Sequence, residues 1–178
     1  MELAIPHVRQ STSWSCGPAS LTAVLRYYGH RHIRESVLIR RSGCNATGTA
    51  ISGLIDASRS FGITPVYAVQ GVHYETLCTV SALGNPVIAA IQAWHDGPIE
   101  SYADVWSDGH FVVVTHADEA GVRIMDPSLA GRGYLEREEW LERWHDIDVG
   151  DRRVVNVAII FPAAVVRRRR CGPTKIVG

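Results

Sequence analysis

A cysteine and a glutamine near the amino end of the chain have the types and spacing needed for acyl transfer. Cys16 is followed directly by Gly17 and Pro18, and apolar residues then recur at helical spacing as far as Gly29. Because proline is favoured in the first turn of a helix and glycine just after its end, we expect a helix that begins beside Cys16. The amino end of a helix favours a thiolate, which is the form of cysteine that attacks carbonyl carbon. Gln10 carries a side-chain amide that could donate to the oxyanion of a tetrahedral intermediate, alongside the backbone N–H of Cys16.

A histidine and an aspartate in the second half of the chain are candidates for the base and its orienter. His110 stands at the start of the apolar run 109–115, and Asp126 at the end of the run 121–127. A hairpin between these runs brings the start of the first beside the end of the second. The register that buries four branched aliphatic residues together pairs His110 with Asp126, Val112 with Ile124, and Val114 with Val122. The imidazole would take the proton of the cysteine and return it to the leaving amine, while the carboxylate fixes the tautomer.

The order of these residues resembles that of the bacteriocin-processing, papain-like cysteine peptidases. The matching segments are Gln10, Cys16-Gly17-Pro18-Ala19, the GHFVVV run at 109–114 and the RIMDP run at 123–127, and the resemblance extends from Val8 to Val157. It implies an α+β, papain-like cysteine peptidase fold, in which an N-terminal nucleophile helix packs on an antiparallel β-sheet. It also implies the catalytic roles, with Cys16 as nucleophile, His110 as general base, Asp126 as orienter and Gln10 as oxyanion donor.

The resemblance leaves the substrate open. Members of this family that trim leader peptides after a double glycine are commonly fused to an ABC transporter, whereas this chain shows no nucleotide-binding motif and looks like the stand-alone form. The main hypothesis is a hydrolase that cleaves a peptide bond, such as that of a leader peptide, through a Cys-His-Asp triad and an acyl-enzyme. The alternatives are an amide-forming acyltransferase that uses the same acyl-enzyme, and a peptide-binding module without turnover. The expected partner is a peptide or protein, and the oligomeric state is left open.

Composition and charge favour one soluble domain. The 178 residues are 46% apolar, which is enough for one core, and we place a peptidase domain at 1–162 and a basic tail with Arg167–Arg170 at 163–178. Eighteen basic residues balance eighteen acidic ones, so no nucleic-acid partner is expected. The sequence has no long apolar run and no targeting leader, which predicts a cytoplasmic protein without a membrane span. Four dispersed cysteines predict free thiols, and the absence of ligand spacing predicts neither a metal nor another cofactor.

The remaining elements are predicted from periodicity and from helix and strand breakers. We expect an extended arm or edge strand at 1–8, helices at 30–41, 49–61, 72–83 and 136–144, the last with Trp140, Leu141 and Trp144 inward, strands at 63–69, 86–93 and 152–161, and loops at 42–48 and 94–109. Thr47 or Thr49 should cap the helix at 49–61. The acidic loop at 94–109 could border a cleft and favour a basic partner. His145 and Asp146 form a rival pair, but we place them in an acidic turn with no strand to hold them.

Overall fold

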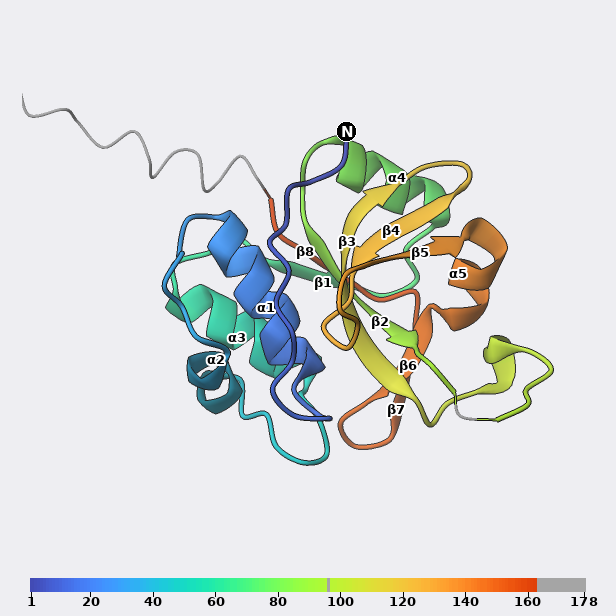
Figure 1. Cartoon of the computed structure of the whole chain (residues 1–178), viewed down its shortest axis with the longest axis horizontal. Coiled ribbons are helices and arrows are strands. Elements are labelled where there is room, and N and C mark those ends of the chain that lie inside the picture. The colour runs from blue at the N-terminus through green and yellow to red at the C-terminus, as the bar shows by residue number, and fades with distance from the viewer. Residues whose placement is uncertain (96, 163–178) are drawn as a thin grey trace, which may run out of the picture.

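A six-stranded antiparallel sheet lies between two groups of helices (Figure 1). The structure, a computed structural model, describes residues 1–95 and 97–162, so the predicted basic tail at 163–178, with Arg167–Arg170 and Cys171, lies outside the described residues. In chain order the elements are α1 (Cys16–Tyr27), α2 (Glu35–Arg41), α3 (Ile51–Ser60), β1 (Tyr67–Val69), α4 (Tyr74–Ala82), β2 (Val87–Gln92), the 3₁₀ helix η1 (Tyr102–Asp104), β3 (Gly109–Ala117), β4 (Gly121–Met125), β5 (Arg132–Glu136), α5 (Arg137–Arg143), β6 (His145–Asp148), β7 (Arg152–Val155) and β8 (Ala158–Ile160). The sheet order is β1-β8-β2-β3-β4-β5, and β6 pairs with β7 separately. The predicted α+β architecture is confirmed.

Helices cover both faces of the central strands. One core cluster joins α1, α2 and α3 to Ile88 and Ala90 of β2 and to Phe111 and Val113 of β3. The other core cluster joins α4 and α5 to the residues of β2 and β3 that point to the opposite face, which include Val87, Ala89, Ile91, Val112 and Val114. All six residues of β2 are therefore buried, as its continuous apolar run predicts.

Helix α1 carries Cys16 at its first residue, as predicted. Pro18 lies in the first turn, and Gly29 follows two residues after the helix ends. Every side chain from Cys16 to Leu25 is buried. Ser20 Oγ donates a 3.1 Å hydrogen bond to the carbonyl of Phe111, which ties α1 to the strand that carries the candidate histidine.

The β3–β4 hairpin forms where the sequence predicts it, but the predicted register is wrong by two residues at the open end. The observed pairs are Val113–Met125, Val114–Ile124, His116–Arg123 and Ala117–Val122. Because the shift there is even, side chains keep their faces, and the four branched residues of the prediction share one core cluster. Continuing this register places Asp126 opposite Val112, so that Asp126 is the diagonal neighbour of His110.

The turn and a bulge explain the difference in register. Asp118 Oδ1 accepts hydrogen bonds from the N–H groups of Ala120, at 2.9 Å, and Gly121, at 3.2 Å, and so closes the turn. An irregularity between Val114 and His116 then absorbs one extra residue on β3. The alternation of apolar residues specifies which face a residue occupies, but it carries no information on either feature.

Several elements are shorter than their sequence patterns. The helix predicted at 30–41 begins only at Glu35, and the strand predicted at 63–69 is reduced to β1. The final strand is divided into β7 and β8 because Asn156, between them, has a φ of 49°, which is outside the β region.

The predicted cap of α3 is wrong. Its N-cap residue is Ala50, which makes no side-chain hydrogen bond, rather than Thr47 or Thr49. The N–H of Ile51 instead donates to Asp148 Oδ1 at 3.1 Å. A carboxylate from β6 thus replaces the local cap and joins α3 to that strand.

The end of α5 corrects two further predictions. Trp140 and Trp144 are fully buried, but Leu141 is 41% exposed because it lies on the outer side of the helix. His145 and Asp146 lie in strand β6, paired with β7, and not in a turn.

Candidate active site

The structure brings together three of the four residues that the sequence predicts for the site. Cys16 heads α1, His110 is the second residue of β3, and Asp126 follows β4 directly. His110 Nε2 lies 2.7 Å from Asp126 Oδ1, and the side chain of Cys16 lies near enough to the ring to raise the pKa of His110. Because Asp126 occupies Nε2, Nδ1 is the ring nitrogen that is left for a second partner. The imidazole and the carboxylate are therefore in direct contact, and Cys16 lies close to the same ring.

The charges of His110 and Asp126 stabilise each other. Burial disfavours the imidazolium, but the hydrogen bonds to Asp126 and Cys16 outweigh burial and raise the pKa of His110 to about 10. Burial also disfavours the carboxylate, yet hydrogen bonds from His110 and Ser128 hold the pKa of Asp126 below its ordinary value. At neutral pH the two groups therefore form a buried ion pair that fixes the orientation of the ring.

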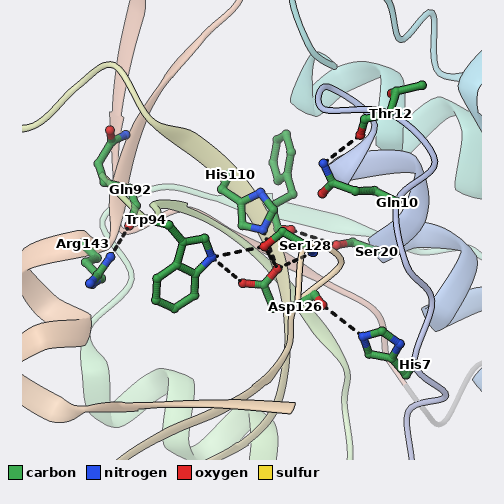
Figure 2. A network of polar contacts seen from close by, with 11 residues as sticks. His7, Gln10, Thr12, Ser20, Gln92, Trp94, His110, Asp126, Ser128 and Arg143 are labelled. Carbon is green, nitrogen blue, oxygen red and sulfur yellow. Dashed lines mark hydrogen bonds and ion pairs between the residues drawn. The ribbon is translucent and has the colours of Figure 1, made fainter. Parts of the chain in front are cut away.

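Asp126 is itself held by residues that the sequence analysis did not identify (Figure 2). Trp94 Nε1 donates to Asp126 Oδ2 at 3.1 Å, and both the N–H and the Oγ of Ser128 donate to Oδ1 at 2.7 Å. His7 Nε2 donates to the backbone carbonyl of Asp126 at 3.2 Å. A serine two residues after an aspartate is a local turn signal that could have revealed Ser128. Trp94 lies in a loop, and no sequence pattern there predicts its hydrogen bond to Asp126.

Gln10, the fourth predicted residue, lies on the extended N-terminal arm, which is tied to β3 and to the segment after β4. The N–H of Leu3 donates to the carbonyl of Thr115 at 2.8 Å, and the N–H of Gln10 donates to that of Pro127 at 3.0 Å. The side chain of Gln10 points to Thr12, whose carbonyl accepts from Nε2 at 2.8 Å (Figure 2), while Oε1 is buried without a hydrogen-bond partner. One of the two N–H bonds of Nε2 is used in this way, and the other has no acceptor among the described residues.

A pocket of about 230 Å³ opens beside Cys16. Its walls come from the loop 47–49, from Trp106 and Ser107 of the long loop, from Phe111 of β3 and from residues 146–148 of β6. The loop predicted at 94–109 thus borders a cleft, as the sequence suggested.

The rival His145–Asp146 pair does not form. His145 Nε2 donates to the carbonyl of Val105 at 2.7 Å. Asp146 Oδ1 accepts from Gln92 Nε2 at 3.3 Å and from the N–H of Ile147 at 2.7 Å. Burial raises the pKa of Asp146 to about 7. His145 and Asp146 therefore have different hydrogen-bond partners, and of the two only Asp146 lines the pocket.

Three further features concern residues 1–95 and 97–162. Cys16, Cys44 and Cys78 are free thiols, as predicted. No group of three or more histidine, cysteine or acidic side chains in these segments is placed to hold a metal ion. None of their helices combines the length and the apolar character that a membrane crossing needs.

The chain is similar in sequence to known proteins. The profile described as Peptidase C39 family matches residues 4–149. An uncharacterised protein of Methanothermobacter marburgensis is 34% identical over 131 residues, which cover 74% of this chain and 77% of that protein. An uncharacterised protein of Methanothermobacter thermautotrophicus matches with the same identity and coverage.

The fold is similar to those of solved peptidase domains. The peptidase domain of Streptococcus ComA superposes with a TM-score of 0.64 at 21% identity, over 89% of this chain and 98% of that domain. A C39-like protein of Bacillus anthracis superposes with a TM-score of 0.69 at 17% identity, over 89% of this chain and 94% of that protein. A double glycine motif protease from an AMS/PCAT transporter, in complex with the leader peptide, superposes with a TM-score of 0.61 at 20% identity. The match covers 91% of this chain and 94% of that protease. The papain-like arrangement of helix and antiparallel sheet is thus shared with these domains.

Proposed function

Because the chain belongs to the Peptidase C39 family, we propose that it is a cysteine peptidase whose nucleophile is Cys16. In this proposal His110 is the general base, Asp126 orients the ring, and Gln10 helps to hold the oxyanion. The observation that carries the proposal is the position of the His110 ring, whose Nε2 lies 2.7 Å from Asp126 Oδ1 while the nearby Cys16 contributes to the raised pKa of the ring. A pocket of about 230 Å³ opens at the same cysteine.

The first half of the reaction forms an acyl-enzyme. The thiolate of Cys16 attacks the scissile carbonyl carbon, so that a C–S bond forms and the carbonyl π electrons move to oxygen. The oxyanion accepts hydrogen bonds from the backbone N–H of Cys16, which has no partner within the helix, and from the second N–H of Gln10 Nε2. The C–N bond then breaks, and the leaving amine takes its proton from Nδ1 of His110.

The second half consumes water. His110, now neutral, accepts a proton at Nδ1 as the oxygen of water attacks the thioester carbon. The C–S bond breaks, which releases the new carboxyl group and restores the thiolate and the imidazolium. Asp126 remains ionised throughout and preserves the tautomer and the orientation of the ring.

The proposed substrate is a leader peptide or another precursor peptide that is cut once. The similar double glycine motif protease binds a leader peptide in its solved complex. In this chain, the pocket beside Cys16 is lined by loops, by β3 and by β6.

Cleavage of a peptide mixture tests the proposal. Purified full-length protein is incubated with peptides derived from a bacterial proteome, and new termini are counted by mass spectrometry. We expect cleavage by the wild type and by Cys44→Ala, which removes another buried free thiol, and none by Cys16→Ala. Cleavage by Cys16→Ala at the wild-type rate would show that another residue is the nucleophile.

A further inference from the structure

One carboxyl group in the pocket beside Cys16 has no role in the proposed reaction. Asp146 lies on β6, at the wall of the pocket, and is 8% exposed. Its position is fixed on two sides. Oδ1 accepts from Gln92 Nε2 and from the N–H of Ile147, and the carboxyl packs so closely on Gly109 that a Cβ there would collide with it.

The second oxygen of this carboxyl group, Oδ2, is the one that lacks a donor in the part of the chain that the structure describes. Among the described residues none donates a hydrogen bond to Asp146 Oδ2, and none forms an ion pair with Asp146. The neighbouring Asp148 differs, because it accepts from the N–H of Ile51 and pairs with Arg152. A buried carboxylate without a cationic partner is costly, and a positively charged group that enters the pocket would remove that cost.

We propose that the pocket beside Cys16 binds a positively charged side chain of the substrate, with Asp146 as the residue that determines this specificity. The inference rests on the proposed peptidase function and names the substrate class, a peptide with lysine or arginine next to the cleaved bond. The size of the pocket agrees with this class. Its volume of about 230 Å³ is several times the ~30 Å³ share of one water molecule in the liquid, so it has room for a long side chain. A glycine would leave it unfilled.

The electrostatic surroundings are consistent with this assignment. Desolvation raises the pKa of Asp146 to about 7, the positive charge of His110 lowers it, and the negative charge of Asp148 raises it. A lysine or arginine placed at Oδ2 would add a second favourable charge and stabilise the ionised form. In the loop at 94–109, Asp108 is engaged by His95 at 2.5 Å, whereas Asp146 on β6 has no such partner among the described residues.

Charge-selective labelling of Cys16 tests the pocket without requiring turnover. Two thiol reagents of similar size are compared, the cationic 2-aminoethyl and the anionic 2-sulfonatoethyl methanethiosulfonate. Each forms a mixed disulfide with the thiolate and releases methanesulfinate. Rates at Cys16 are read by site-resolved mass spectrometry and divided by the rates with N-acetylcysteinamide. We expect a cation-to-anion ratio of at least about ten, although the imidazolium of His110 by itself would favour the anion.

Two variants assign the preference to Asp146. Asp146→Asn keeps an oxygen for Ile147, and we expect its ratio to fall to one or below. Asp108→Asn makes the same change of charge outside the pocket, and we expect it to keep the wild-type ratio. A wild-type ratio near one, or an equal fall in both variants, would overturn the proposal.

Cleavage of the peptide mixture tests the same charge preference on peptide substrates. We expect lysine or arginine to be enriched at one fixed position next to the cut, and this enrichment to disappear in Asp146→Asn. Cleavage without any preference for basic residues would refute the specificity and leave the peptidase function intact. If no peptide is cut, the proposed function fails, and the labelling ratio still decides whether the pocket prefers cations.

Discussion

His110 Nε2 lies 2.7 Å from Asp126 Oδ1, although the two residues are 16 positions apart and do not face each other directly across the hairpin. They are diagonal neighbours on β3 and just beyond β4, which is within reach of an imidazole and a carboxylate. The hairpin thus positions the ring, and the contact with Asp126 leaves Nδ1 as the ring nitrogen for a second partner. The proposed chemistry depends on this relationship.

Removing the charge of Asp126 should disable His110 without removing it. Asp126→Asn presents an amide that can stabilise the wrong tautomer, so we expect kcat/KM to fall by about 10³- to 10⁴-fold. Peptide cleavage under single-substrate conditions measures this loss. Asp56→Asn, which alters an exposed ion pair with Arg59, is the matched control and should retain activity. A fall of less than about tenfold in Asp126→Asn would show that Asp126 does not orient the base.

Trp94 should act as a positioning residue through its N–H alone. Trp94→Phe keeps an aromatic ring but removes the donor that lies 3.1 Å from Asp126 Oδ2. A hydrogen bond to a charged group contributes about 1.5–3 kcal/mol, so we expect kcat to fall by about tenfold or more with little change in KM. Steady-state kinetics separate the two constants. An effect on KM only would mean that Trp94 contacts the substrate instead.

The sequence is sufficient to predict the elements whose signals are local. The head of α1 follows from Gly17 and Pro18 after Cys16, and the buried strand β2 follows from its apolar run. The ends of β3 and β4, and with them His110 and Asp126, follow from alternation. In each case the physical cause, a backbone preference or a periodicity, lies within a few residues of its effect.

The parts that were missed depend on contacts between distant segments. Trp94 contacts Asp126 only because the loop at 94–109 lies at the end of the hairpin. The sequence of the loop contains no pattern that predicts this contact. Asp146 was assigned to a turn because its pairing partner in β7 is not adjacent in sequence. The hairpin register depended on the side chain of Asp118 and on one bulge, both invisible to a count of apolar residues.

The His110 pair should make stability depend on pH in a definite direction. The pKa of His110 is raised from 6.5 to about 10, so the stabilisation is complete below pH 6.5 and is lost as pH rises through about 10. We expect the difference in free energy of unfolding between wild type and His110→Gln to shrink over that window. Urea unfolding at the two ends of the window measures it. A difference that stays constant with pH would contradict the raised pKa.

Gly109 should be required because Asp146 occupies the space of a side chain. In Gly109→Ala the added Cβ collides with the Asp146 carboxyl group, so we expect the free energy of unfolding to fall by about 1–3 kcal/mol. The loss should be smaller when Asp146 is also replaced by alanine, with a coupling energy of about 1 kcal/mol. Urea unfolding of the four proteins completes the cycle. Additivity within about 0.5 kcal/mol would show that the two residues are not in contact.

The central claim, that Cys16 is a nucleophile activated by His110, is tested most directly by the order in which the cysteines react with iodoacetamide at neutral pH. Peptide mapping by mass spectrometry gives a separate rate for each cysteine. We predict that Cys16 reacts first, ahead of Cys44 and Cys78, and that His110→Gln removes its lead. Faster labelling of Cys44 or Cys78 in the wild-type protein would contradict the assignment.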